Sequence, residues 1–251
     1  MKIASLALVV AVLAGGFVND FVNSAAAQTV RFGTVAEYPP YNFLDSEGEL
    51  QGFDADLGKA ICARAALNCD WVLAPWPELI SQLGDSEFDA IMTGFGVTEA
   101  RKLQINFSTP YISAQKAAVL TLKGAADLSS GATVGVEINS LQADYVRQTD
   151  WNTRQFDTPS AGIMAVLDRS ISGFLANQAY LQAIIANTPD TFILVNKDIP
   201  IEGEIGIGVA KSSSLLPTLN AAITSLQADG TIDTLISRWF KGENQTADGA
   251  D

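Results

Sequence analysis

The pattern of hydrophobic and polar positions divides the chain into short apolar runs and longer amphipathic stretches. A short apolar run between turn residues predicts a buried strand, whereas apolar residues at three- and four-residue spacing predict a helix. In the first part of the chain, the predicted strands cover residues 30–34, 70–73 and 88–92. One predicted helix follows Gly52, with Asp54 as its expected N-cap, and a second begins at Trp76 and Pro77. The order β-α-β-α-β predicts a parallel sheet covered by helices.

The same pattern then restarts, which predicts a second α/β unit and therefore two lobes. Its predicted strands cover residues 117–122, 132–136, 171–175 and 192–195, and its predicted helices cover residues 140–146, 160–168 and 178–186. An apolar segment at 206–210 and two helices at 215–229 and 231–240 complete the pattern. The polar residues 243–251 are expected to form a disordered acidic tail.

One loop between a strand and a helix carries the first candidate for binding chemistry. Thr93 to Gly96 follow the third predicted strand, and open α/β sheets bind ligands at the carboxyl ends of their strands. Thr98 is the expected N-cap of the next helix, whose free backbone N–H groups attract anions. Arg101 adds a planar group that suits a carboxylate. The alternative is an ordinary strand-turn-helix with Arg101 in solvent.

Composition and charge narrow the function classes. Of 251 residues, 48% are hydrophobic and 17% are charged, which is typical of a globular protein with a core. The net charge of −13 argues against nucleic acid or an anionic membrane as a partner. The chain contains no histidine, which excludes a Ser-His-Asp triad, a histidine metal site and histidine acid–base catalysis. We expect no cofactor and no metal.

Residues 1–27 have the pattern of a secretory signal peptide. Lys2 is the short positive region, residues 3–18 are apolar, and Ala25 to Ala27 offer a cleavage site. A membrane anchor is the alternative, but about 16 apolar residues are fewer than the roughly 20 that span a bilayer. The sequence therefore predicts export.

The two cysteines, Cys62 and Cys69, are seven residues apart. On one continuous helix they would lie about 10 Å apart, which is too far for a disulfide. A helix end at Leu67 and Asn68 would let the chain turn back and close the bond. Two free thiols are the alternative, although an oxidising compartment favours the disulfide.

Five sequence segments carry a resemblance to a known family. They are FGTVAEYPPYNF (32–43), GELQGFDADLGKAI (48–61), FDAIMTGFGVTEARKLQINFSTPY (88–111), ATVGVEINS (132–140) and DGTIDTLISRWF (229–240). In this order and spacing they resemble the bacterial periplasmic solute-binding proteins of polar amino acid ABC transporters, solute-binding protein family 3. Cys62 and Cys69 also resemble a disulfide that some members carry.

The resemblance implies an α/β, two-lobed, type II periplasmic-binding-protein fold whose lobes are joined by a two-stranded hinge. The first lobe would comprise residues 28–113 and 205–242, and the second residues 114–204. The implied protein is a periplasmic, monomeric binding protein rather than an enzyme. It would close on a small carboxylate-bearing solute, an amino acid or a derivative, and present it to a membrane ABC permease.

The resemblance also assigns ligand contacts to individual residues. Arg101 matches the arginine that binds the ligand α-carboxylate, which agrees with the pattern of its loop and helix. The other matching positions are Tyr38 and Phe53 as aromatic walls, Trp76 as a lining residue, Thr93 and the backbone of Gly94, and Ser140 from the second lobe.

Three positions depart from the family pattern. Gly96 and Leu141 stand where hydroxyl residues are common, and Asn177 stands where the family carries the aspartate that binds the ligand ammonium. An amide cannot neutralise an ammonium group. Either another acid, Glu137 or Glu37, binds the ammonium, or the ligand lacks a free one.

Several alternatives stay open. Glu137 and Glu37 could be solvated surface acids, and a quaternary nitrogen could instead contact Trp76 or Tyr38 through cation–π interaction. An enzyme resembling the periplasmic cyclohexadienyl dehydratases would need a general acid, for which Glu137 is the candidate. The chain could also be a binding or partner protein without a transporter, or a member that no longer binds a solute.

Overall fold

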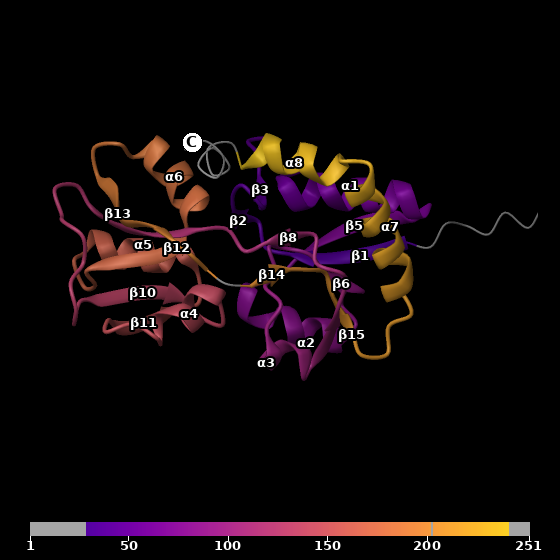
Figure 1. Ribbon diagram of the computed structural model, residues 1–251, viewed down its shortest axis with the longest axis horizontal. Coiled ribbons are helices and arrows are strands. Elements are labelled where there is room, and N and C mark those ends of the chain that lie inside the picture. The colour runs from indigo at the N-terminus through magenta and orange to yellow at the C-terminus, as the bar shows by residue number, and fades with distance from the viewer. Residues whose placement is uncertain (1–28, 202, 241–251) are drawn as a thin grey trace, which may run out of the picture.

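The computed structural model describes residues 29–201 and 203–240 and has two α/β lobes (Figure 1). The expected signal peptide (1–27) and acidic tail (243–251) lie outside the described residues. The two lobes agree with the two α/β units expected from the sequence. Within the described residues, no helix is both long and apolar enough to cross a membrane.

The first lobe is built on a five-stranded sheet with the order β5-β1-β6-β15-β7. Its strands are β1 (Thr29–Thr34), β5 (Asn68–Leu73), β6 (Ala90–Ile91), β7 (Ile105–Phe107) and β15 (Gly208–Ala210). Strand β1 pairs in parallel with β5 and β6, whereas β15 is antiparallel to both β6 and β7. A small sheet of β2 (Glu37–Tyr38), β3 (Asn42–Leu44) and β4 (Leu50–Gln51) lies beside it.

The second lobe repeats this topology, as the restart of the sequence pattern predicts. Its sheet has the order β11-β10-β12-β9-β13, with β10 parallel to β11 and β12, and β9 antiparallel to β12 and β13. The strands are β9 (Ala117–Leu122), β10 (Thr133–Glu137), β11 (Asn152–Phe156), β12 (Gly173–Asn177) and β13 (Phe192–Ile199).

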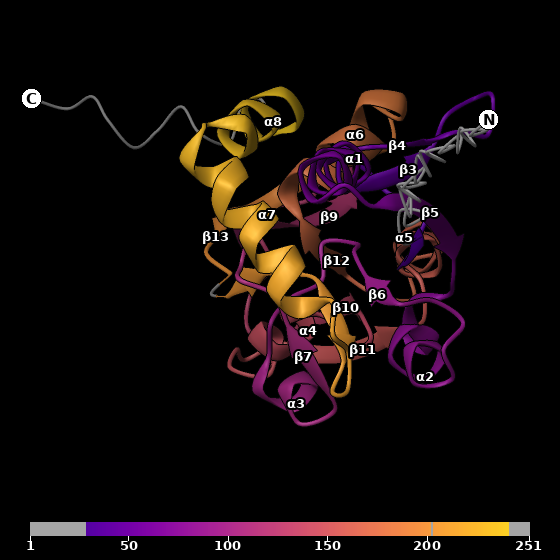
Figure 2. The ribbon, with the colours of Figure 1, turned by 90° about the vertical axis from the view of Figure 1, so that its right-hand side faces the viewer.

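Helices lie on both faces of the first-lobe sheet (Figure 2), and the helices of the second lobe pack in two separate clusters against its sheet. In the first lobe they are α1 (Phe53–Ala65), α2 (Leu79–Gly84) after a 3₁₀ turn η1 (Trp76–Glu78), α3 (Glu99–Lys102), α7 (Leu216–Ala228) and α8 (Thr231–Trp239). In the second lobe they are α4 (Leu141–Val146), α5 (Pro159–Leu167) and α6 (Gln178–Asn187). The alternation along β6 shows the two layers, because Ala90 packs with α1 and α7 residues whereas Ile91 packs with α2 residues.

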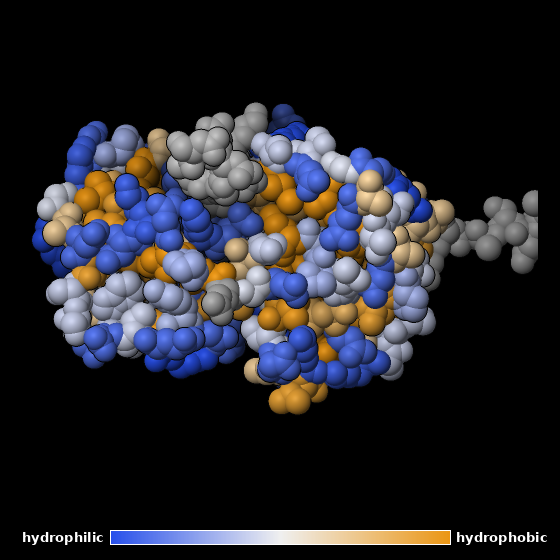
Figure 3. Space-filling model, viewed as in Figure 1, coloured by the Kyte–Doolittle hydropathy of each residue, from blue (hydrophilic) through white to orange (hydrophobic). Residues whose placement is uncertain are grey.

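The surface of the molecule is mixed in character. On the face that Figure 3 shows, blue hydrophilic residues surround smaller orange patches. The sheets and helices therefore bury most of their apolar residues between the layers of each lobe.

The start of α1 corrects the predicted capping residue. The N-cap is Gly52, and Asp54 lies inside the first helical turn, where it is fully buried. Gly52 has a φ of 125°, and a Cβ there would lie 2.1 Å from the Tyr41 carbonyl oxygen, so only glycine fits. The buried Asp54 carboxylate is thereby free to bind other parts of the chain.

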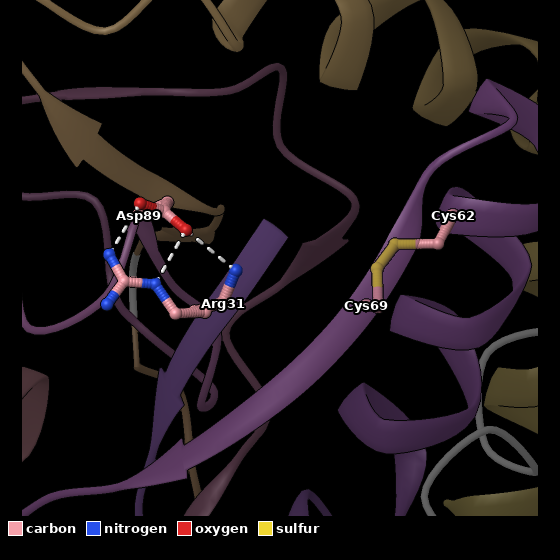
Figure 4. Close-up of a disulfide and its surroundings, with 4 residues drawn as sticks. All are labelled: Arg31, Cys62, Cys69 and Asp89. Atoms are coloured by element: carbon pink, nitrogen blue, oxygen red, sulfur yellow. Dashed lines mark hydrogen bonds and ion pairs between the residues drawn. A yellow bond between two sulfur atoms is a disulfide. The ribbon is translucent and has the colours of Figure 1, made fainter. Parts of the chain in front are cut away.

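The disulfide expected between Cys62 and Cys69 is confirmed. Helix α1 ends at Ala65, Ala66 takes a left-handed conformation, and the chain turns back into β5. The two cysteine Cα atoms lie 6.2 Å apart and the bond joins α1 to β5 (Figure 4). Both thiols are therefore used, and the alternative of free cysteines is wrong.

Figure 4 also shows how Arg31 on β1 fixes the start of β6. The Arg31 backbone N–H and Nε donate to Asp89 Oδ2 at 2.9 and 3.1 Å, and Nη2 donates to Oδ1 at 2.9 Å. These hydrogen bonds from Arg31 lower the pKa of Asp89. The residues that follow β6 are therefore held in place beside β1.

Two short strands mark where the chain passes between the lobes. Strands β8 (Ile112–Ser113) and β14 (Glu204–Ile205) pair antiparallel there. Gly96 forms a bridge with Ile205, and the Val97 N–H donates to the Glu204 carbonyl oxygen at 2.7 Å. The glycine loop is therefore attached directly to the crossing strands.

Candidate ligand-binding site

A cavity of about 510 Å³ lies between the two lobes. Nine of the ten residues singled out from the sequence line it, namely Tyr38, Trp76, Thr93, Gly94, Gly96, Arg101, Glu137, Ser140 and Asn177. The first six come from the first lobe and the last three from the second. The fold therefore collects candidate contacts from distant parts of the chain into one space.

Phe53 is the exception, and its expected role as an aromatic wall is wrong. Its side chain is fully buried and is absent from the cavity lining. As the first residue of α1, it packs with ring-centroid distances of 6.3 Å to Tyr41, 6.0 Å to Tyr111 and 5.2 Å to Phe240. Tyr41 rather than Phe53 lies at the cavity, because Phe53 points into the core of the first lobe.

Asp54 holds the glycine loop in place, a role that the sequence did not reveal. Its carboxylate accepts hydrogen bonds from the Gly94 N–H and from the Tyr111 hydroxyl, the latter at 2.9 Å. Burial raises the pKa of Asp54 to about 7, and both hydrogen bonds oppose this rise. Gly94 has a φ of +58°. A side chain there would also meet the Tyr41 ring at 3.1 Å.

Arg101 is buried beside the cavity, so the alternative of an arginine in solvent is wrong. Thr98 caps α3 as predicted, with its hydroxyl accepting from the Arg101 N–H at 3.2 Å. The guanidinium lies 3.9 Å from the centre of the Phe95 ring and 5.1 Å from that of Trp76. Burial lowers the pKa of Arg101 to about 10, so the side chain is charged at neutral pH.

The lobes contact one another through this arginine and through Trp76. Arg101 Nη1 donates to the Gly96 carbonyl oxygen in its own lobe, and Nη2 donates to the Asn139 carbonyl oxygen in the other, both at 2.6 Å. Trp76 Nε1 donates to the Ile138 carbonyl oxygen at 2.7 Å. The first lobe therefore binds the loop between β10 and α4.

An aromatic contact joins the lobes beside the cavity. The rings of Tyr38 and Tyr180 stack across the lobes with centroids 4.8 Å apart and an interplanar angle of 18°. Tyr38 also stacks on Tyr41 within its own lobe at 5.7 Å. Offset aromatic pairs of this kind contribute beyond the area they bury. The molecule is therefore in a closed arrangement around the cavity.

Glu137, the last residue of β10, is not a solvated surface acid. Burial raises the pKa of Glu137 to about 8, and the charge of Arg101 opposes this rise. Among the described residues, the Glu137 carboxylate has neither a hydrogen-bond donor nor an ion-pair partner. By contrast, Glu37 is exposed and accepts a hydrogen bond from Ser160 Oγ at 3.4 Å.

The polar groups of Ser140 and Asn177 are used within the second lobe. Ser140 caps α4, with Oγ accepting from the Ala143 N–H at 3.0 Å and donating to the Glu137 carbonyl oxygen at 2.8 Å. Asn177 caps α6, with Oδ1 accepting from the Ala179 and Tyr180 N–H groups at 2.9 and 3.2 Å. The Asn177 amide N–H groups remain as donors, which cannot bind a cation.

The cavity also has lining residues that the sequence analysis missed. They are Val35, Ala36, Tyr41, Leu44, Leu73, Ala74, Pro75, Ala114, Gln115, Gln142, Asp157, Thr158, Pro159 and Ile205. Glu37, the second candidate acid for the ligand ammonium, and Leu141 line the cavity as well. Asp157 and Thr158 follow β11, a strand whose residues are mostly exposed and polar. The absence of an apolar run explains why this strand and the loop after it gave no signal.

Acidic side chains outnumber basic ones around the cavity. Three carboxylates, those of Glu37, Glu137 and Asp157, line it together with one cation, Arg101. Across residues 29–201 and 203–240, no three acidic or cysteine side chains are grouped so that they could hold a metal ion. The cavity therefore combines one anion-binding group with several groups that favour a cation.

Comparison of the sequence and the structure with known proteins identifies the family of this chain. The model of the bacterial extracellular solute-binding proteins, family 3, matches residues 30–242. ABC transporter arginine-binding protein 1 of Escherichia coli K12 is 28% identical over 238 residues, which cover 91% of this chain and 98% of that protein.

Solved structures of similar sequence confirm the two-lobed, type II periplasmic-binding-protein fold expected from the sequence. A periplasmic His/Glu/Gln/Arg/opine family-binding protein from Silicibacter pomeroyi, in complex with lysine, is 33% identical with a TM-score of 0.78, covering 88% of this chain and 100% of that one. An ancestral amino acid-binding protein, described as a precursor of cyclohexadienyl dehydratase, is 26% identical with a TM-score of 0.73, covering 85% and 96%. The chain belongs to family 3 of the bacterial extracellular solute-binding proteins.

Proposed function

We propose that this protein is the periplasmic binding component of an ABC importer and that it captures a basic amino acid, arginine or lysine. The observation that carries the proposal is the cavity between the lobes, where Arg101 lies together with three acidic side chains. A basic amino acid has one carboxylate and two cationic groups, which complements this set of charges. The names of the similar binding proteins from E. coli and S. pomeroyi support the same class of ligand.

Arg101 retains the hydrogen-bonding capacity that a carboxylate requires. A guanidinium has five N–H groups, and Arg101 uses two of them on the Gly96 and Asn139 carbonyl oxygens. The other three are available to a ligand. Because Arg101 is buried, its charge is little screened by water, so a bound carboxylate would be held strongly.

The proposal includes location and partners. Export to the periplasm is supported by the signal-peptide pattern at residues 1–27, and an ABC permease is the partner of similar transporter proteins. Lobe limits at Ser113 and Glu204 are supported by the β8–β14 pair where the chain crosses between the lobes. We propose a monomer that closes on its ligand and performs no chemistry.

Thermal unfolding against a panel of amino acids tests this function. A ligand at 100 times its dissociation constant adds about 2.7 kcal/mol of stability, which raises the Tm of a chain of this size by roughly 5–11 °C. L-arginine or L-lysine is expected to give this shift, and L-glutamate is expected to give none. A shift with L-glutamate alone, or with no amino acid, would contradict the proposal.

A dehydratase is the second candidate function. It is favoured by Glu137, because a carboxyl group whose pKa is raised to about 8 stays protonated at neutral pH and can act as a general acid. Prephenate is the substrate to test, and formation of phenylpyruvate can be followed by absorbance. Turnover that is lost in Glu137→Gln would establish this second function, whereas the importer proposal predicts no product.

A further inference from the structure

Asn177 cannot provide the negative charge that the ammonium of an amino acid needs. Its side-chain oxygen already accepts two backbone hydrogen bonds at the start of α6, from Ala179 and Tyr180. What remains for the cavity is an amide N–H donor, which would repel an ammonium group. The amino acid proposed as ligand therefore needs another acid nearby.

Glu137 lies at the same edge of the same sheet. Strand β10 pairs in parallel with β12 through Val134 opposite Gly173 and Gly135 opposite Phe174. Carried two residues further, this register puts Glu137 beside Ala176, the neighbour of Asn177. Adjacent strands are about 4.8 Å apart, and Glu137 and Asn177 both line the cavity, so Glu137 faces the same ligand space from the next strand.

Glu137 is also the acid of the cavity that lacks a partner. Glu37 and Asp157 are both exposed, where water screens their charges, and Glu37 contacts Ser160. Glu137 is shielded, and no described residue donates to or pairs with its carboxylate. Glu137 is half-buried, and its charged form without a partner is costly, so a cationic group of a ligand would stabilise that form.

The positions of Glu137 and Arg101 suit a ligand that carries an ammonium and a carboxylate group close together. The charge of each side chain affects the other, yet they form no ion pair, so their charged groups are close but do not touch. In an α-amino acid, the carboxylate and the ammonium are attached to one carbon atom. Such a group can bind Arg101 through its carboxylate and Glu137 through its ammonium at the same time.

We propose that Glu137 binds the α-ammonium of the ligand whose carboxylate binds Arg101, and that it thereby determines the specificity of the site for free amino acids. This inference rests on the proposed function. It places the ammonium-binding acid at the end of β10, at Glu137, rather than at the start of α6, where Asn177 lies. Glu37 and Asp157, at the exposed rim, are left to interact with the distal cation of the ligand.

Isothermal titration with paired ligands tests the inference. L-arginine and 5-guanidinopentanoate differ in the α-ammonium, so the ratio of their affinities measures recognition of that group. Glu137→Gln is expected to lower the affinity for L-arginine by about 30-fold or more, which corresponds to about 2 kcal/mol. The affinity for 5-guanidinopentanoate is expected to change by less than about threefold. For a protein that prefers L-lysine, 6-aminohexanoate replaces 5-guanidinopentanoate.

Matched variants separate this role from a general loss of negative charge. Glu37→Gln and Asp157→Asn also remove one acid each from the cavity, but they are expected to affect both ligands of a pair equally. Adding Asn177→Asp to Glu137→Gln returns an acid to the same sheet edge and is expected to recover the preference for L-arginine. Aspartate caps helices as well as asparagine does, so this change preserves the start of α6.

The possible failures are distinguishable. The inference is overturned, while the proposed function stands, if the wild-type protein binds L-arginine but Glu137→Gln lowers the affinities for both ligands of the pair equally or leaves both unchanged. The same holds if the wild-type protein prefers the ligand without the ammonium. If the wild-type protein binds no ligand of either pair, the proposed function fails, and the inference fails with it.

Discussion

Leu141 fills the space that a side chain at residue 96 would need. A Cβ placed on Gly96 would lie 2.7 Å from Leu141 Cγ and 2.9 Å from its Cδ1. The two residues come from different lobes, so their contact forms when the lobes close. Gly96 and Leu141 therefore form one structural feature, in which an apolar side chain of the second lobe fills the space beside a glycine of the first.

This contact predicts that Gly96→Ala interferes with closure. The added methyl group overlaps Leu141, and overpacking of this kind costs about 1–3 kcal/mol, so we expect affinity for L-arginine to fall roughly tenfold. The Tm without ligand should change little if the lobes can open. Adding Leu141→Ala removes the overlap and should restore most of the affinity, which calorimetric titration of the four proteins would measure as a coupling energy. Independent, additive effects would contradict the account.

Arg101→Ala should remove the binding of carboxylate ligands. Loss of a buried charged partner costs about 2–5 kcal/mol, so L-arginine affinity is expected to fall about 100-fold or more. Agmatine, which lacks the carboxylate, should lose less affinity than L-arginine, because for agmatine the variant removes only the contact between Arg101 and Asn139 that helps to hold the lobes together. Lys102→Ala is the matched control, since Lys102 lies on the same helix but pairs with Glu99 at the surface. Unchanged L-arginine affinity in Arg101→Ala would refute the site.

The raised pKa of Asp54 predicts that the folding stability depends on pH. Its pKa is raised to about 7 in the folded protein, so between its unfolded value and pH 7 the folded state binds more protons than the unfolded state. Stability therefore falls as pH rises, by roughly 2–3 kcal/mol between pH 5 and pH 8. Glu137 contributes to the same fall because its pKa is also raised, to about 8.

Asp54→Asn separates the two contributions. Urea unfolding at pH 5 and pH 8 should show a smaller loss of stability in Asp54→Asn than in the wild-type protein, and Glu137→Gln should reduce the loss independently. An identical pH dependence in Asp54→Asn and the wild-type protein would show that the carboxyl group is not buried in its protonated form.

Ligand binding should release a proton at neutral pH. The ligand-free Glu137 carboxyl is protonated below about pH 8, and an ammonium group beside it would stabilise the carboxylate. The charge of Arg101 acts in the same direction, and Tyr180 stays protonated because burial raises its pKa further above neutrality.

Calorimetry in two buffers of different ionisation enthalpy measures this release. At pH 7, where the α-amino group of the free ligand is protonated, we expect up to about one proton released per ligand bound. Glu137→Gln should release none. Equal release from Glu137→Gln and the wild-type protein would assign the proton to another group.

The disulfide should stabilise the fold without changing the affinity for the ligand. Replacing Cys62 and Cys69 by alanine is expected to cost roughly 2–3 kcal/mol, which lowers the Tm by roughly 4–12 °C. Neither cysteine lines the cavity, so the affinity for L-arginine should stay within about twofold. A large loss of affinity would show that α1, which carries Asp54, depends on the bond for its position.

Local sequence patterns were sufficient for the fold and for part of the site. Apolar runs and helical spacing predicted two α/β units, and a hydroxyl before a helix predicted the cap at Thr98. Arg101 could be found because the glycine loop and the helix that follow β6 are contiguous in the sequence. These features depend on residues that lie close together along the chain.

The features that were missed depend on contacts between distant residues. Asp54 resembles a helix cap in the sequence, but Gly52 caps the helix and Asp54 binds Gly94 forty residues away. Phe53 is an aromatic residue of the right segment, but the direction of its ring is set by Tyr111 and Phe240. The complementarity of Gly96 and Leu141 likewise exists only where the two lobes meet.

The central claim is that the closed cavity between the lobes binds a basic amino acid through Arg101. Isothermal titration of the protein with L-arginine and L-lysine, repeated with Arg101→Ala, tests it most directly. We expect saturable binding of one ligand per chain to the wild-type protein and loss of that binding in Arg101→Ala. Absence of binding to the wild-type protein, or undiminished binding to Arg101→Ala, would contradict the account.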